Sequence, residues 1–352
     1  MLYHTRNPHG GDLYSRPVVL DFSANINPFG TPQAVKDAVV NAVDCLRNYP
    51  DPYCRELISA ISRYEGVEED CVLCGNGAAE LIFSYCMALQ PRKAMVLSPC
   101  FSEYETALRG LGREACHYLL KREDHFALTE AFLPELSAFD GDLLMLCNPN
   151  NPTGQVIEAN LMEKILKICT EKNISLFVDE CFLDLTEGGE DLSLKGKLRE
   201  YPGIFLLKAF TKSYGMAGLR LGYCLCGNPE LLRAMGQSVQ PWNVSIPAQR
   251  AGVAALGQVE FLAKANEMIR SQRPWLTEEL TRLGLEVIPS RTNYILFYSG
   301  RELQQPLLEK GIQIRSCANY PGLSQGWYRI AVKLPEDNRQ LIRAIEQVLK
   351  QK

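Results

Sequence analysis

Residues Ile204–Gly222, IFLLKAFTKSYGMAGLRLG, place a lysine shortly after a strongly apolar run. The run Ile204–Lys208 predicts a buried strand, and Lys212 follows its end closely. A lysine at the end of a buried strand can lose its charge in an enclosed site, and the neutral amine can then form an imine with a carbonyl. A single lysine is more often a solvated surface group, so the interpretation depends on the segments around it.

Further apolar runs of the same kind lie on either side of this segment, with helical patterns between them. Such alternation predicts an α/β fold with a mainly parallel sheet that is covered by helices on both faces. The runs are Cys71–Cys74, Ala94–Ser98, Leu143–Cys147, Ser175–Asp179 and Leu221–Cys226. In such folds ligands bind beyond the carboxyl ends of the strands, so we expect the chemistry in the loops that follow them.

Three of these loops carry residues suited to a charged ligand. Gly75–Glu80, GNGAAE, opens a helical pattern whose N–H groups and dipole would face an anion, although the third glycine of a dinucleotide motif is missing and an ordinary turn is the alternative. Asn148–Gly154, NPNNPTG, presents asparagine amides on a loop fixed by two prolines, or is simply a tight turn. Asp179 ends an apolar strand, where a carboxylate requires a positive partner unless it caps a helix.

The C-terminal part of the chain has a different pattern. A charged helical stretch from Ala248 to Leu283 leads into short apolar runs and a closing helix. These are strands at Tyr294–Tyr298, Ile312–Arg315 and Tyr328–Val332, and a helix at Asp337–Leu349. Because 352 residues exceed the size at which single cores stop growing, we expect two domains. The large domain would span 46–245, and 1–45 with 246–352 would form a smaller α+β domain that includes the connecting helix.

Composition and charge exclude several classes of function. No apolar run is long enough to span a bilayer, and a net charge of −4 with a pI near 5.8 offers no basic surface for nucleic acid. Met1–Arg6 lacks the apolar core of a signal peptide, so we expect a cytoplasmic chain whose 13 cysteines are reduced and form no disulfides. The Cys71–Cys74 spacing has no matching second pair, and with only four histidines we predict no metal site.

These segments, in this order, resemble the fold-type I pyridoxal-phosphate (PLP) enzymes of the aspartate aminotransferase superfamily, in particular the histidinol-phosphate aminotransferase branch. The likeness runs from about Asp21 to the C-terminus. Asn-Pro-x-Asn-Pro-Thr-Gly, the Asp-Glu strand end and Lys…Gly-Leu-Arg-x-Gly are together highly specific. The resemblance implies an aspartate-aminotransferase-like fold, PLP as the cofactor and a homodimer.

The resemblance also implies roles for individual residues. Lys212 would form the Schiff base with PLP, and Asp179 would pair with the protonated pyridine nitrogen that makes the ring an electron sink. Asn151 would donate a hydrogen bond to the phenolic oxygen of the ring, and Phe101 would lie against the ring face. Tyr49 would reach the cofactor phosphate in the neighbouring subunit. The other residues that would hold the phosphate are Ala78, Ala79, Thr211 and Arg220.

The two ends of the chain resemble one group within this branch, the threonine-phosphate decarboxylases of cobalamin biosynthesis. The segments are HGG at 9–11, DFSANINP at 21–28 and IRSCANYPGL at 314–323, followed by Tyr328 and Arg329. Phe182 agrees with this group, since aminotransferases of the branch commonly have a tyrosine there that donates to the phenolic oxygen. By this resemblance the residues that contact the phosphate and carboxylate of the substrate would be His9, Gly10, Asn25, Asn151, Arg315 and Arg329.

The resemblance implies a small phosphorylated amino acid as substrate and PLP-dependent decarboxylation of O-phospho-L-threonine to (R)-1-aminopropan-2-yl phosphate. Amino transfer from histidinol phosphate or a related compound is the alternative, because the positions of Arg315 and Arg329 do not show which bond at Cα is held perpendicular to the ring. A PLP-binding regulator is the third possibility, but it would carry a DNA-binding domain for which Asp21 leaves no room. Phosphothreonine and phosphoserine are not separated by the sequence.

Overall fold

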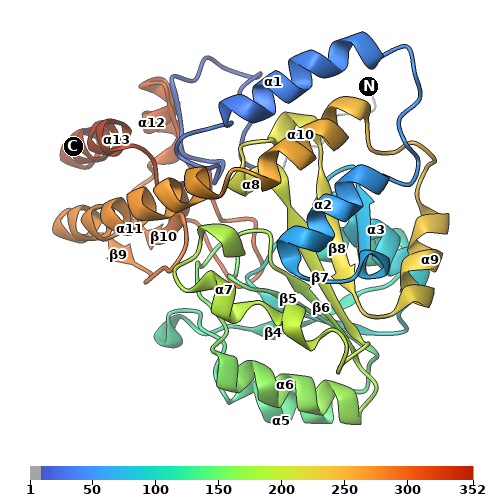
Figure 1. Cartoon of the computed structure of the whole chain (residues 1–352). Coiled ribbons are helices and arrows are strands. Elements are labelled where there is room, and N and C mark those ends of the chain that lie inside the picture. Colours follow the sequence, from blue (N-terminus) through green and yellow to red (C-terminus); the bar gives the residue numbers. More distant parts are fainter. Residues whose placement is uncertain (1–8, 352) are drawn as a thin grey trace.

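The centre of the molecule is a seven-stranded sheet (Figure 1). Its strands are β2 (Val72–Gly75), β3 (Ala94–Ser98), β4 (Ala115–Leu119), β5 (Leu143–Cys147), β6 (Ser175–Asp179), β7 (Ile204–Ala209) and β8 (Gly222–Cys226). They lie in the order β2-β8-β7-β6-β5-β3-β4. Strand β8 is antiparallel to both neighbours and the other pairs are parallel. The predicted α/β fold with a mainly parallel sheet is confirmed.

The computed structural model describes residues 9–351. Met1–Arg6, which was analysed above for a signal peptide, and the start of the predicted 1–45 segment lie outside the described residues. Within 9–351 no helix combines the length and the apolar character needed to cross a membrane. The same residues contain no group of three or more His, Cys, Asp or Glu side chains placed to hold a metal ion.

Helices cover both faces of the large sheet. One face is covered by α3 (Ala78–Leu89), α4 (Glu103–Gly110) and α9 (Pro229–Ser238). The other is covered by α2 (Arg55–Glu65), α5 (Phe132–Ala138) and α6 (Ala159–Glu171). Phe177 and Phe205 belong to the first core, whereas Val178 and Leu206, one position further along each strand, belong to the second. Successive side chains of a strand point to opposite faces, so continuous apolar runs fill both cores.

A smaller sheet follows in the C-terminal part of the chain. Its order is β12 (Arg315–Ser316), β13 (Trp327–Ala331), β10 (Tyr294–Tyr298) and β9 (Glu286–Val287), and every neighbouring pair is antiparallel. The helices of this part are α11 (Val259–Arg282), α12 (Gln304–Glu309) and α13 (Pro335–Lys350). On α13 the apolar side chains Leu341, Ile345 and Val348 recur at helical spacing and are buried, which explains how this helix packs on the sheet.

Two helices rather than one connect the large sheet to the small one. The sequence predicts a helical stretch from Ala248 to Leu283, whereas the structure has α10 (Ile246–Leu256) followed by α11. Gly257 caps α10, and α11 begins only at Val259. Glycine is a poor residue for a helix interior, which accounts for the break.

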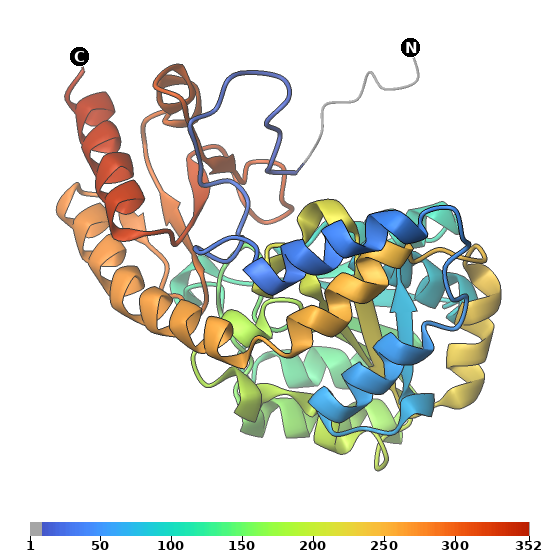
Figure 2. The ribbon, with the colours of Figure 1, turned by 45° about the horizontal axis from the view of Figure 1, so that its top comes forward.

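The N-terminal segment runs beside the C-terminal part of the chain, as the dark blue and red ribbons of Figure 2 show. Strand β1 (Leu20–Asp21) pairs in parallel with β11 (Ile312–Gln313). Helix α1 (Gln33–Ala42), in contrast, packs along α10, and its Val35 belongs to a core of the large sheet. The division of the chain at residues 45 and 245 stays a prediction.

Candidate active site

Lys212 lies in the short helix α8 (Phe210–Ser213), which begins directly after β7. Its Nζ is 5.6 Å from the centre of the Phe182 ring. Burial, reinforced by the positive charges of Arg329 and Arg220, lowers the pKa of Lys212 to about 8. The neutral amine, which is the form that attacks a carbonyl, is therefore accessible near neutral pH.

Asp179, the last residue of β6, is buried and accepts two hydrogen bonds. Tyr104 Oη donates to Oδ2 at 2.6 Å, and the Cys181 amide donates to Oδ1 at 2.9 Å. Burial raises the pKa of the Asp179 carboxyl, whereas these hydrogen bonds and the charge of Lys212 lower it. The bond to Cys181 matches the alternative of a local cap, but the rest of the environment is that of a carboxylate held ready for a cation.

The N-terminus of α3 and the guanidinium of Arg220 together form a cradle of hydrogen-bond donors. Gly77, the N-cap residue, has a φ of +82° and brings no capping side chain. A Cβ added to Gly77 would lie 2.3 Å from Arg220 Nη2, so the guanidinium lies directly over this turn. Ala78 and Ala79 are the first two residues of the helix, where N–H groups have no partner within the helix. These residues fit a phosphate group.

The remaining residues expected around the ring come from three different segments of the chain. Thr211 is next to Lys212 in α8 and is partly exposed. Asn151 is buried, and its Oδ1 accepts a hydrogen bond from Arg329 Nη1. Phe101 lies edge-on to Tyr104, with 5.7 Å between the ring centres.

Tyr49 is the one cofactor residue expected from the sequence that lies apart from this group. It is 78% exposed and stacks on Trp242, with the ring centres 4.5 Å apart. Within one chain it is a surface residue.

Arg315 and Arg329 are direct partners across the antiparallel pair β12 and β13. Both are buried, and residues directly opposite each other in such a pair point to the same face. Arg329 Nη2 donates to the carbonyl of Ser23 at 2.8 Å, and Arg315 Nη2 donates to Asn319 Oδ1 at 2.7 Å. Two like charges in this position repel each other unless an anion lies nearby. In the described part of the chain Arg329 Nε is buried without a hydrogen-bond partner.

The N-terminal segment brings further expected substrate residues to these arginines. Both amide atoms of Asn25 are buried without a hydrogen-bond partner in the described part of the chain, as expected of a side chain that binds a ligand. Gly10 abuts Ser23, since an added Cβ would lie 2.4 Å from the Ser23 carbonyl oxygen. His9 Nε2 lies 2.8 Å from Glu103 Oε1.

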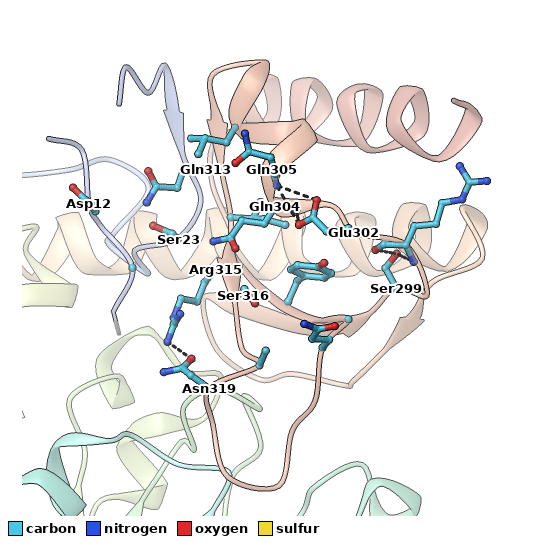
Figure 3. A pocket seen from close by; sticks show the side chains of 18 of the residues that line it. Asp12, Ser23, Ser299, Glu302, Gln304, Gln305, Gln313, Arg315, Ser316 and Asn319 are labelled. Atoms are coloured by element: carbon cyan, nitrogen blue, oxygen red, sulfur yellow. Dashed lines mark hydrogen bonds between the residues drawn. The ribbon is translucent and has the colours of Figure 1, made fainter. Parts of the chain in front are cut away.

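A cavity of about 1290 Å³ opens between the N-terminal segment and the small sheet (Figure 3). Its lining includes His9, Gly10, Ser23, Arg315 and Asn319, but neither Lys212 nor Asp179. Figure 3 shows Arg315 and Asn319 pointing toward each other at the end of this cavity that is closest to the large sheet.

Sequence reasoning missed two residues that hold this site together. Tyr104 follows Phe101 by three residues, in the first turn of α4, and this closeness in sequence is the only signal that links it to the site. Asn27 donates from its amide to the Lys212 carbonyl at 3.0 Å and from its side chain to the Ser213 carbonyl at 2.8 Å. No local pattern reveals this contact, because it joins segments far apart in the chain.

Comparisons with known proteins agree with this geometry. Residues 17–345 match the family model of aminotransferase class I and II. The chain is 38% identical to threonine-phosphate decarboxylase of Salmonella typhimurium, over 97% of this chain and 96% of that one.

Two solved structures have the same fold. The histidinol-phosphate aminotransferase of Clostridium acetobutylicum superposes with a TM-score of 0.87 at 29% identity, over 94% of this chain and 99% of that one. A double mutant of Thermus thermophilus aspartate aminotransferase gives a TM-score of 0.79 at 25% identity, over 94% of this chain and 92% of that one. The fold is therefore aspartate-aminotransferase-like, and the chain belongs to the aminotransferase class I and II family of PLP-dependent enzymes.

Proposed function

We propose that this enzyme decarboxylates O-phospho-L-threonine to (R)-1-aminopropan-2-yl phosphate in cobalamin biosynthesis. The observation that carries the proposal is the cross-strand pair Arg315 and Arg329, which offers two buried guanidinium groups to a substrate with two anionic groups. The relative named threonine-phosphate decarboxylase, which matches the chain over nearly its full length, supports the choice of substrate.

The residues present fit PLP. The cradle formed by Ala78, Ala79 and Arg220 would hold the phosphate together with Thr211. Lys212 would attach to the cofactor covalently, Asp179 would pair with the ring nitrogen, and Phe101 would cover the ring. Asn151 Oδ1 already accepts from Arg329, so its amide nitrogen would be the atom that donates to the ring oxygen. When bound, PLP supplies an electron sink for the bond that breaks at Cα.

The chain's own groups orient the substrate and move a proton. Arg329 and Arg315 would bind the carboxylate and the phosphate, while Asn25 would complete the hydrogen bonds to the substrate. After the carboxylate leaves, Cα must gain a proton. Lys212 Nζ, whose pKa is lowered to about 8, is the group we assign to donate it.

Amino transfer is the second candidate, favoured by the likeness to histidinol-phosphate aminotransferase. Phe182 argues against it. Its ring packs edge-on against Tyr294 at 5.0 Å and has no hydroxyl to donate to the cofactor.

The experiment incubates the purified holoenzyme with O-phospho-L-threonine in the absence of any keto acid. We expect CO2 and a phosphorylated amino alcohol. A parallel reaction with histidinol phosphate and 2-oxoglutarate measures amino transfer, and O-phospho-L-serine measures the selectivity for the methyl group. Amino transfer that proceeds faster than decarboxylation would overturn the proposal.

We also propose a homodimer in which Tyr49 reaches the cofactor phosphate of the neighbouring subunit. Tyr49 is one of several exposed large apolar side chains, most of them close to it in the sequence, and patches of exposed apolar side chains mark protein interfaces. The others are Val40, Val43, Leu46, Tyr53 and Trp242. Light scattering should give twice the mass of one chain, and a fully active monomer would contradict the proposal.

We place this reaction in the cytoplasm. All thirteen cysteines are free thiols in the structure, which suits a reducing compartment.

A further inference from the structure

Glu103, at the start of α4, connects the large sheet to the N-terminal segment. Its Oε1 lies 2.8 Å from His9 Nε2, and the Glu103 side chain is 18% exposed. A carboxylate is only an acceptor, so Nε2 of the imidazole must be the donor. The His9 ring also lies 5.7 Å from the Phe101 ring, which comes two residues before Glu103. His9 is therefore held against the start of α4 by both a hydrogen bond and an aromatic contact.

The same N-terminal segment is fixed at its other end by Ser23. The Gly11 amide donates to Ser23 Oγ at 2.7 Å, and Ser23 Oγ donates to Asp21 Oδ1 at 2.6 Å. The Ser23 carbonyl accepts from Arg329 Nη2 at 2.8 Å. Residues 9–11 thus bridge α4 on one side and the substrate arginine on the other.

We propose that Glu103 is a positioning residue, which holds His9 in place to bind the phosphate of the substrate. This inference rests on the proposed function, because it takes a phosphorylated substrate as the ligand. A hydrogen bond from Nε2 to a carboxylate fixes the orientation of an imidazole and directs Nδ1 to the other side of the ring. His9 lines the same cavity as Arg315, so the imidazole held in this orientation lies beside the arginine proposed to bind the substrate.

The sign of the effect separates positioning from plain electrostatics. A carboxylate close to a phosphate repels it, so a Glu103 that acted only through its charge would weaken substrate binding. Removing that carboxylate would then improve binding of the phosphorylated substrate. If Glu103 positions His9, its removal weakens binding instead.

The test compares Glu103→Ala and Glu103→Gln in the holoenzyme. For Glu103→Ala we expect kcat/KM for O-phospho-L-threonine to fall about tenfold, equivalent to about 1.4 kcal/mol, mainly through a higher KM. Glu103→Gln should recover to within about threefold of wild type, because its amide oxygen accepts the same hydrogen bond. Added to His9→Ala, the Glu103→Ala change should cause no further loss.

Glu105→Ala is the matched control, since Glu105 lies on the same helix but pairs with Arg109 at 3.1 Å. It should stay within about twofold of wild type, as expected for a pair whose Arg109 is exposed and whose Glu105 is partly exposed. L-threonine, which has no phosphate, should bind equally well to wild type and Glu103→Ala. The proposal would be overturned if Glu103→Ala kept kcat/KM for O-phospho-L-threonine within twofold of wild type. It would also be overturned if Glu103→Ala bound this substrate more tightly, or if it lost equal affinity for O-phospho-L-threonine and L-threonine.

A binding measurement separates this inference from the proposed reaction. Titration of the holoenzyme with O-phospho-L-threonine or histidinol phosphate, followed by the absorbance of bound PLP, gives dissociation constants without turnover. A wild type that transfers amino groups instead of decarboxylating, but still loses affinity for phosphorylated ligands on Glu103→Ala, would contradict the proposed function alone. Failure of both ligands to bind the wild type would overturn both.

Discussion

Tyr104 Oη donates a hydrogen bond of 2.6 Å to Asp179 Oδ2, and both side chains are buried. This bond lowers the pKa of the Asp179 carboxyl against the effect of burial. In Tyr104→Phe the pKa of Asp179 should therefore rise, and the carboxylate should hold a protonated ring nitrogen less well. A hydrogen bond to a charged group contributes about 1.5–3 kcal/mol, so kcat should fall at least tenfold while PLP remains bound. Tyr118→Phe on β4 is the control and should behave as wild type in steady-state kinetics.

Lys212→Ala should abolish both turnover and the yellow absorbance of bound PLP, because the attaching amine is gone. The control is Lys167→Ala, a change at a lysine that is 76% exposed on α6. Full activity in Lys212→Ala, with the cofactor content measured by absorbance, would refute the assignment of this site.

Arg315→Ala and Arg329→Ala should each strongly reduce kcat/KM for a phosphorylated amino acid, while PLP stays largely bound. Removing one member of a desolvated charge pair costs about 2–5 kcal/mol, a loss on the order of thirtyfold or more in kcat/KM. Arg301→Ala is the matched control, because Arg301 lines the same cavity as Arg315 but donates to the Leu349 carbonyl at 3.0 Å. Near-native kcat/KM in both variants would contradict the assignment of the arginines to the substrate anions.

His9→Ala should also weaken binding of the phosphorylated substrate. Binding of an unphosphorylated analogue should be affected less. The imidazole is expected to contact the phosphate and not the amino acid part. Comparing KM for O-phospho-L-threonine with the dissociation constant of L-threonine measures this difference. Equal changes for both ligands would show that His9 serves only to hold the segment in place.

Attachment of PLP to the apoenzyme should have a pH dependence set by Lys212. Only the neutral amine reacts, and burial with two nearby arginines lowers its pKa to about 8. The rate should rise with pH up to about 8 and level off above it, instead of rising toward the ordinary lysine value of 10.5. Arg329→Ala removes one of the two positive charges, so the midpoint should move to higher pH. Stopped-flow absorbance measures this rate, and an unshifted midpoint near 10 would contradict the assignment.

Much of the large sheet could be predicted because its strands are buried on both faces. The predicted bounds of β3, β5 and β6 equal the observed ones, as do those of β10 in the small sheet, since each strand centres on an apolar run between polar loops. Strand β4 was missed, because it lies at the edge of the sheet and its sequence ACHYL is partly exposed. This strand shows neither a continuous apolar run nor regular alternation of polar and apolar residues.

The contacts that hold the site together could not be predicted from local sequence patterns. The Asn27 side chain meets the Ser213 carbonyl across 186 positions, and Arg329 meets the Ser23 carbonyl across 306. The spacing of apolar residues identifies one helix or strand at a time. It therefore indicates which strand precedes Lys212, but not which distant segment forms hydrogen bonds beside it. For Ser23 and Asn27 the sequence supplied a family likeness but no contact.

The pairing of β1 with β11 also has a consequence for synthesis on the ribosome. Residues 20–21 are made long before their partners at 312–313. Domains fold as they emerge, N-terminal parts first, so the large sheet can form while β1 still lacks a partner. The segment that carries Ser23 can therefore dock against Arg329 only after residues 312–313 have been made and β11 can pair with β1.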